Sequence, residues 1–374
     1  MQQGERLKGL DDFKWIAAAL VVAIHTSPLE SINETADFLL TRVLARLAVP
    51  FFLMVTGYFV LYGAYAAGNA AKIKRCLLKL LCLYLATTLL YLPVKLYQFL
   101  GEWALYRNIA PKDIILQAGR AVFFDGTYYH LWYLPAVVLG LILVWGSLSI
   151  LGRTGTFLCV WLLYLIGLLG DSYYGVTAQI PFLSSLYEVI FKISSHTRNG
   201  LFYAPLFLLL GYEVAIRTRL QTGLVGQPDE NGHIRKESAL FFFGTLLLMC
   251  GEGLGLHILR WQRHDSMYLL LPFCMQGLFT LLLSYQGKES KPRGFYTKAQ
   301  WKAFYEKGPM LLYCLHPAVI LILRGFVKVT KFRFMLTISP LYYLIVLGGS
   351  LCLVYICIRI RGGYESVSER KKHP

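Results

Sequence analysis

The sequence predicts an all-helical membrane protein, a bundle of about ten transmembrane helices. Hydrophobic residues make up 56% of the 374-residue chain, charged residues make up only 16%, and the mean hydropathy is +0.52. Soluble domains carry about 25% charged residues. The apolar residues gather in blocks of about 17–25, the length that a helix needs to cross roughly 30 Å of hydrocarbon. These observations exclude an ordinary soluble globular domain.

Ten apolar segments follow one another along the chain. They are 12–28, 43–63, 76–98, 131–151, 155–171, 200–216, 239–259, 267–286, 309–327 and 338–360. Only "GRTG" separates the fourth segment from the fifth, a length that still allows an antiparallel helical hairpin. Residues 99–130 and 171–199 are predicted to be outer loops, the first with an amphipathic stretch, "DIILQAGRAVFF". We expect residues 1–374 to form a single transmembrane domain.

The net charge of +16 is attributed to the loops of a membrane protein. Lysine and arginine collect in cytoplasmic loops. They are concentrated in the segments that lie inside if the N-terminus is cytoplasmic, whereas the first outer segment, "SINETAD", is acidic. The charge distribution therefore predicts that both termini are cytoplasmic, with the basic "KVTKFR" at 328–333 as an exception. No motif indicates a nucleic-acid partner.

The eight cysteines give no sign of a metal site. All of them lie in or beside apolar segments, and none forms a C-x-x-C pair. Cysteine in such surroundings behaves as a small buried hydrophobic residue. We therefore expect neither a disulfide framework nor a bound metal.

Two polar residues, Lys14 and His25, lie in the first apolar segment. They are eleven residues apart, which on a helix is a rise of about 16 Å and a rotation that returns to within about 20° of the start. They share a face on which Ala18 lies between them, and a small residue leaves room for a neighbouring helix or a narrow channel. Lys14 is alternatively a lysine that snorkels to the inner surface, and His25 an interfacial residue at the outer end.

Two further polar residues lie at membrane depth, where polar side chains usually face the protein interior. His316 precedes Pro317, and it is a partner of His25, a second proton carrier, or a residue that bonds to backbone groups that the proline frees. Glu252 lies between glycines in "CGEGLGLH". It could orient a histidine or line a substrate path, or it could bond locally to His257 or to the backbone.

A group of polar and aromatic residues marks the point where an outer loop meets the fourth segment. Asp125, His130 and Trp132 lie here together with several tyrosines, and Arg198 lies in the next outer loop. One interpretation is an aromatic belt at the membrane surface. The other is a substrate-binding rim that stacks on a sugar or an amino-acid acceptor.

Several stretches resemble the acyltransferase 3 family of integral membrane acyltransferases. The family signature is an arginine, ten residues and a histidine. In "DFKWIAAALVVAIHTSPL", Lys14 stands at the arginine position and His25 matches the histidine. The stretches "RLAVPFFLMVTGYFVL" (46–61), "KIKRCLLKLLCLYL" (72–85), "HLWYL" (130–134) and "YCLHP" (313–317) are similar to later family segments.

The resemblance implies an enzyme that transfers an acyl group other than an amino-acyl group. Acyl-CoA, the expected donor, would approach from the cytoplasm, and an acetyl group is the expected cargo. The phosphates of the donor would be held by Lys72, Lys74, Arg75 and Lys79, with Lys14 deeper. His25 would deprotonate a hydroxyl group of an envelope glycan or of a small acceptor. The alternative for the basic residues is ordinary cytoplasmic loop charge. A bacterial plasma membrane is the implied location.

A narrower likeness is to the membrane half of the membrane-bound serine racemases of vancomycin-resistance operons. It is carried by "VAIHTSPL", "DGTYYHLWYLP", "GDSYYG", "TRNGLFYAP" and "HDSMYLLLP". Those proteins add a soluble pyridoxal-phosphate domain after the membrane half, and we expect neither that cofactor nor racemase activity in this chain. The likeness suggests an alternative function, a transporter or membrane module that handles a small amino acid such as L-serine.

Overall fold

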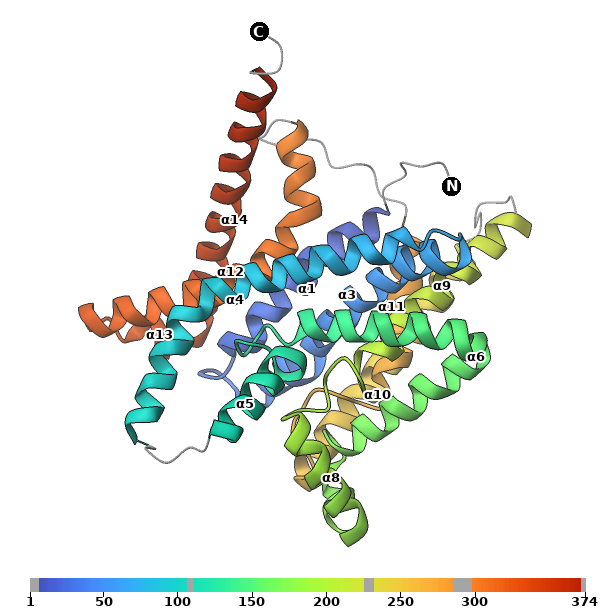
Figure 1. Ribbon diagram of the computed structural model, residues 1–374, viewed down its shortest axis with the longest axis horizontal. Coiled ribbons are helices and arrows are strands. Elements are labelled where there is room, and N and C mark those ends of the chain that lie inside the picture. The colour runs from blue at the N-terminus through green and yellow to red at the C-terminus, as the bar shows by residue number, and fades with distance from the viewer. Residues whose placement is uncertain (1–6, 106–110, 225–231, 286–297, 371–374) are drawn as a thin grey trace. The chain divides into compact units, whose positions relative to one another are not determined.

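The computed structural model describes residues 7–105, 111–224, 232–285 and 298–370 (Figure 1). All regular secondary structure in these ranges is helical, which confirms the predicted all-α class. The chain divides into two compact units, each described here by itself. Unit 1 consists of Met1–Ala48 and Phe279–Pro374, and unit 2 consists of Val49–Leu278.

Unit 1 combines the two ends of the chain. Its elements are α1 (Lys8–Thr26), α2 (Glu34–Phe38), the π-helical turn η1 (Leu39–Val43), the 3-10 turn η2 (Leu44–Leu47), α12 (Lys298–Thr330), α13 (Phe334–Thr337) and α14 (Ser339–Arg370). Helix α1 contacts both α12 and α14, and these two helices also contact each other. The core between them is apolar, with Ala18 and Val22 of α1 packed in one cluster with Leu312 and Val346.

Unit 2 contains the middle of the chain, and α3 and α11 extend a few residues beyond its bounds. Its elements are α3 (Ala48–Thr56), the π-helical turn η3 (Gly57–Ala66), α4 (Ala71–Leu105), α5 (Pro111–Arg120), the π-helical turn η4 (Ala121–Asp125), α6 (Tyr133–Leu169), α7 (Tyr174–Ala178), α8 (Pro181–Ile193), α9 (Ala204–Leu224), α10 (His233–Leu259) and α11 (Leu271–Leu283). Helix α9 is its centre, because it packs against both η3 and α6, and Leu206–Leu210 are buried.

Helix α6 consists of two arms that meet at a sharp bend (Figure 1). The bend is at Gly152, where φ is 65° and ψ is −173°. A positive φ combined with ψ near 180° is a conformation that essentially only glycine adopts. The side chain of Arg153, next to the bend, donates from Nε to Glu213 Oε1 of α9 at 2.7 Å. The predicted hairpin at "GRTG" is therefore present as two helical arms joined at this glycine.

Six helices in the described ranges are long and apolar enough to cross a membrane. They are Glu34–Ala66, Ala71–Gly101, Tyr133–Leu169, His233–Leu259, Gln300–Thr330 and Ser339–Ile360. The remaining predicted segments, 12–28, 200–216 and 267–286, coincide with α1, α9 and the short apolar helix α11. The structure thus gives a helical membrane protein, while the number ten and the side of the termini stay predictions.

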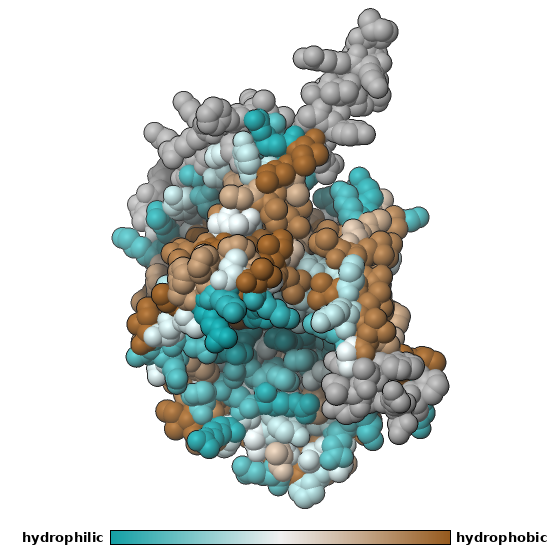
Figure 2. Space-filling model, turned by 90° about the vertical axis from the view of Figure 1, so that its left-hand side faces the viewer, coloured by the Kyte–Doolittle hydropathy of each residue, from teal (hydrophilic) through white to brown (hydrophobic). Residues whose placement is uncertain are grey.

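Helix α4 presents a face suited to lipid. Exposed leucines recur every three or four residues along it, at Leu78, Leu81, Leu85, Leu89, Leu92, Leu96 and Leu100. This spacing places them on one side of the helix. Figure 2 shows such apolar surface in brown beside hydrophilic areas in teal. In water, exposed apolar surface of this extent is a liability, whereas in a bilayer it is the expected lipid contact.

Candidate functional site

A cavity of about 520 Å³ lies in unit 1 at the C-terminal end of α1. Its volume falls within the roughly 300–1,000 Å³ range of small-molecule sites. The loop 27–33 and helices α12, α13 and α14 line it together with α1. Its polar lining includes His25, Thr26, Glu30, Arg324, Thr337 and Tyr342.

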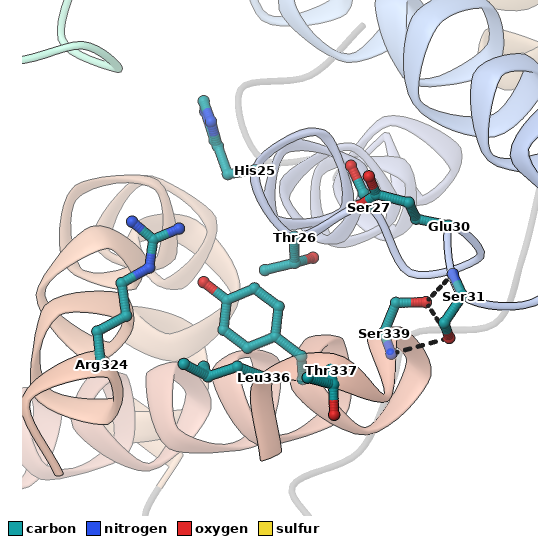
Figure 3. Close-up of a pocket in the computed structure, with 10 residues that line it drawn as sticks. His25, Thr26, Ser27, Glu30, Ser31, Arg324, Leu336, Thr337 and Ser339 are labelled. Atoms are coloured by element: carbon teal, nitrogen blue, oxygen red, sulfur yellow. Dashed lines mark hydrogen bonds between the residues drawn. The ribbon is translucent and has the colours of Figure 1, made fainter. Parts of the chain in front are cut away.

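Backbone and hydroxyl hydrogen bonds fix the shape of this end of the cavity. Helix α1 ends at Thr26, and the next residue, Ser27, takes a left-handed conformation with φ of 46° and donates its N–H to the carbonyl of Ala23. The N–H of Ser31 donates to Ser339 Oγ at 3.0 Å, and the N–H of Ser339 donates to Ser31 Oγ at 3.1 Å. Figure 3 shows these bonds as dashed lines between the loop and the start of α14. The loop that carries Glu30 is therefore held in place.

His25 lines the cavity and stacks on His316. The ring centroids are 5.2 Å apart and the planes differ by 22°. His25 is half-buried, and His316 is fully buried, with its Nδ1 3.2 Å from the carbonyl oxygen of Leu312. A carbonyl only accepts hydrogen bonds, so in a neutral His316 ring this contact requires the proton on Nδ1.

The structure thus brings together the two histidines that the sequence singled out. Among the described residues that line the cavity, His25 is present and His316 is not. Any influence of His316 on a ligand of this cavity would pass through His25, on which it stacks. The catalytic role of His316 stays a prediction, without a contact to the cavity that supports it.

Tyr342 supplies a hydroxyl group that no described protein group satisfies. Its side chain is 7% exposed, and within the described ranges its buried oxygen has no hydrogen-bond partner. Leaving a buried polar group unsatisfied costs about 1–3 kcal/mol. Because Tyr342 lines the cavity, a ligand or a water molecule there can satisfy this hydroxyl.

Lys14 makes a local contact at the other end of α1. Its Nζ lies 2.7 Å from Asp11 Oδ1. Ala18 and Val22, which lie between Lys14 and His25 on the helix face, are 1% and 0% exposed. They belong to the packed core with α12 and α14. The small residues on this face therefore hold neighbouring helices, and the face is not an open channel from Lys14 to His25.

The four basic residues predicted to hold the donor lie together in the first turns of α4, in unit 2. Lys72, Lys74, Arg75 and Lys79 are all exposed. The N-terminal end of a helix carries a partial positive charge that adds to theirs. The structure keeps these cations at one end of one helix, and phosphate binding there stays a prediction.

Glu252 has a structural role in unit 2. Its Oε1 accepts from the N–H of Leu269 at 2.6 Å and from the hydroxyl of Tyr173 at 2.9 Å, and its Oε2 accepts from the N–H of Leu270 at 3.0 Å. These bonds tie α10 to the segment before α11 and to the loop after α6. The local-bonding alternative is observed, and the catalytic role of Glu252 stays a prediction without a supporting contact.

A second cavity, of about 340 Å³, lies in unit 2. Three of the four predicted substrate-binding residues, Asp125, Trp132 and Arg198, line it. The fourth, His130, is 1% exposed and packs edge-on against Tyr91 and two other tyrosines. His130 is therefore part of the aromatic wall beside the cavity and not of its lining.

Sequence reasoning missed several lining residues. Arg324 lies inside the apolar segment "VILILRGFV", and a charge at that depth is a signal that could have found it. Tyr342 carried no such signal, because it is one of 25 tyrosines. In unit 2, Lys95 and His196 line the second cavity and were not singled out.

The chain is similar to proteins named as racemases. It is 37% identical over 359 residues to an amino-acid racemase of Enterococcus faecalis, a match that covers 95% of this chain and 46% of that protein. It is 34% identical over 371 residues to a serine/alanine racemase of Enterococcus gallinarum, a match that covers 98% of this chain and 48% of that protein. The chain spans about half the length of these curated relatives. No solved structure matches it.

The family comparison agrees with the likeness seen in the sequence. The family model described as acyltransferase domain matches residues 7–359. This range includes His25 and His316 of the first cavity, and it covers nearly the whole chain. This membrane protein therefore belongs to the acyltransferase 3 family.

Proposed function

We propose that this protein transfers an acyl group, in the first instance acetyl, from cytosolic acyl-CoA to a hydroxyl group of an envelope acceptor in the bacterial plasma membrane. One observation carries the proposal. In a chain of the acyltransferase 3 family, the histidine that matches the family signature lines a polar cavity and is backed by a second, buried histidine.

The proposed reaction assigns one proton transfer in each direction to His25. The imidazole accepts the proton of the acceptor hydroxyl while the oxygen attacks the thioester carbonyl carbon. A C–O bond forms, the C–S bond breaks, and the sulfur leaves as free CoA with the proton from the imidazolium. The stacked ring of His316 holds His25 in orientation, and the Tyr342 hydroxyl is available to donate to the acceptor or to the developing oxyanion.

The donor is expected to use cations, because CoA carries several phosphates. Lys72, Arg75 and Lys79, with Lys74, offer exposed positive charges at the start of α4. Lys14 is bonded to Asp11, which lowers its value as a phosphate ligand. The proposed chemistry needs neither a metal nor pyridoxal phosphate, because the thioester itself is the activated group.

The proposal is tested by measuring free CoA. The full chain is purified in detergent and incubated with acetyl-CoA and cell-envelope glycan. We expect the His25→Gln variant to release CoA at least about 100-fold more slowly, since a general base contributes typically 10²–10⁴-fold.

The matched control is His233→Gln. The side chain of His233 is 74% exposed at the start of α10, and this variant is expected to keep the wild-type rate. Unchanged turnover in His25→Gln would remove His25 from the mechanism. No glycan-dependent release by the wild type would count against an envelope glycan as the acceptor.

A second candidate function rests on the names of the relatives. Because they are an amino-acid racemase and a serine/alanine racemase, the membrane part they share with this chain could handle a small amino acid such as L-serine. Reconstituted vesicles distinguish the two functions. Uptake of labelled L-serine without thioester cleavage would support the transporter, and cleavage without uptake would support the acyltransferase.

A further inference from the structure

The second cavity, in unit 2, has the features of an independent ligand site. Its volume is about 340 Å³, near the lower end of the range for small-molecule sites. It is built from α4, from η4 and the segment that joins it to α6, and from the loop before α9. The lining used in the argument is Lys95, Asp125, Tyr129, Trp132, His196 and Arg198.

Asp125 holds two walls of this cavity together. Its Oδ1 accepts from the N–H of Ser195 at 3.0 Å and from the hydroxyl of Ser194 at 3.3 Å. The Nε of Arg120 lies 3.7 Å from its Oδ2. The carboxylate therefore accepts hydrogen bonds from the protein, and a neighbouring cation offsets its charge. These bonds fix the positions of the two walls before a ligand binds.

The remaining charges of the lining are positive. Lys95 and Arg198 both carry a positive charge at neutral pH. The pKa of His196 is lowered to about 3, first by burial and then by nearby positive groups, of which Arg198 contributes most and Arg263 and Arg120 also contribute. His196 is therefore neutral at pH 7 and stacks on His264 with the ring centroids 4.2 Å apart. The positive electrostatic potential at this wall favours the binding of an anion.

Arg198 is held in a fixed plane. Its guanidinium carbon lies 5.2 Å from the centre of the Trp132 ring, and its Nη1 donates to Ser266 Oγ at 3.2 Å. A guanidinium group presents five N–H donors in a planar fork that matches the two oxygens of a carboxylate. Fixing this fork before binding reduces the entropy lost when a ligand is ordered.

The geometry points to a binding site in unit 2 for a small monocarboxylate, with Arg198 and Lys95 on its carboxylate and Tyr129 and Trp132 against an apolar or planar body. A single carboxylate matches the lining better than a dianion does, because the cations among the described residues that line the cavity are one guanidinium fork, that of Arg198, and one ammonium group, that of Lys95. This inference goes beyond acyl transfer and does not depend on it.

Helix α4 places the cavity at the opposite membrane surface from the proposed donor cations. Lys72 and Lys95 are 23 residues apart on one helix, which is a rise of about 35 Å. That length is close to the roughly 30 Å thickness of the hydrocarbon core. With Lys72 at the cytoplasmic surface, the carboxylate would enter from outside.

Calorimetric titration of the full chain in detergent with sodium benzoate tests the site. Benzamide, neutral and of nearly the same shape, is the matched ligand. We expect saturable binding of benzoate and none of benzamide, with Arg198→Gln weakening the affinity about tenfold and Lys95→Gln about threefold. Lys236→Gln, an exposed lysine of α10, and His25→Gln should both bind as the wild type does.

Arg198→Gln removes a bond to Ser266 and could perturb folding, so Lys95→Gln, on an exposed lysine, provides the second variant. Equal affinity for benzamide, or wild-type affinity in both variants, would overturn the inference. Tighter binding of inorganic phosphate would also overturn it. So would benzoate binding that disappears in phosphatidylglycerol nanodiscs but persists in phosphatidylcholine nanodiscs, because the site would then belong to a lipid headgroup.

Discussion

The hydroxyl of Tyr342 differs from that of most buried tyrosines because it is available to a ligand. Most buried polar groups have a protein or water partner. In the described ranges the Tyr342 hydroxyl has none from the protein, yet its ring packs in the core of unit 1. Tyr164 of unit 2 is also buried, and its hydroxyl donates to the carbonyl of Tyr268 at 2.7 Å. The two tyrosines differ in what the hydroxyl does for the fold.

This difference predicts opposite results for two conservative substitutions. Tyr342→Phe should leave thermal unfolding nearly unchanged and lower kcat/KM for acyl transfer about tenfold, since a ligand hydrogen bond is lost. Tyr164→Phe should lower the free energy of unfolding by about 0.5–1.5 kcal/mol and leave kcat/KM intact. Thermal melts and CoA release on both variants provide the measurement. A destabilised Tyr342→Phe with normal kinetics would show that the hydroxyl belongs to the fold.

The sequence could identify single residues with reactive side chains, but it could not identify the residues that they contact. His25 and His316 were recognisable because polar side chains at membrane depth are rare and face the interior. A pairing of His316 with His25 was one of the alternatives, but the stacked geometry could not be predicted, because it depends on how α1 packs against α12. Glu252 drew attention for the same reason as His25, yet its three hydrogen bonds serve the chain around it.

Among the elements, α3, η3 and α9 make the closest helix contacts of unit 2. A Cβ atom on Gly57 would lie 1.9 Å from the carbonyl oxygen of Leu208, and one on Gly211 would lie 2.1 Å from that of Met54. Both glycines therefore allow backbone to approach backbone, as small residues commonly do between membrane helices. Neither position can accept a methyl group unless the helices separate.

Gly211→Ala should therefore destabilise the protein by about 1–3 kcal/mol, the usual cost of overpacking. Gly244→Ala is the control, because nothing lies within 4 Å of a Cβ atom on Gly244 in α10. It should be neutral or stabilising by up to about 1 kcal/mol, since alanine is the better helix former. The measurement is thermal unfolding in detergent, and equal stability of the two variants would disprove the close contact.

The lengths of the apolar segments predicted the positions of most helices. The helices that they did not predict were missed for physical reasons. The amphipathic stretch at 113–124 is helical as α5 and η4. The predicted outer loop at 171–199 contains α7 and α8. Helix α8 is only 13 residues long, so a search for spans overlooks it. The bend at Gly152 was recognisable as a turn, since "GRTG" interrupts two apolar runs.

For the whole molecule, the open question is how many times α6 crosses the membrane. As one long helix it would cross once, and 171–199 would then lie in the cytoplasm. As two arms joined at Gly152 it crosses twice, and 171–199 lie outside. The positive φ at Gly152 and the two arms of Figure 1 favour two crossings, which also keeps Arg153 on the cytoplasmic side as charge bias requires.

Single cysteines in a cysteine-free background test this topology with a maleimide that cannot cross membranes. Ile32, 69% exposed before α2, and Lys192, exposed on α8, mark two of the proposed outer segments. We expect Ile32→Cys and Lys192→Cys to be labelled in intact cells, and His233→Cys only after permeabilisation. Labelling of Ile32→Cys but not Lys192→Cys in intact cells would mean that α6 crosses once. The fully reversed pattern would place the termini outside, and the proposed donor cations of α4 would then lie on the wrong side for cytosolic acyl-CoA.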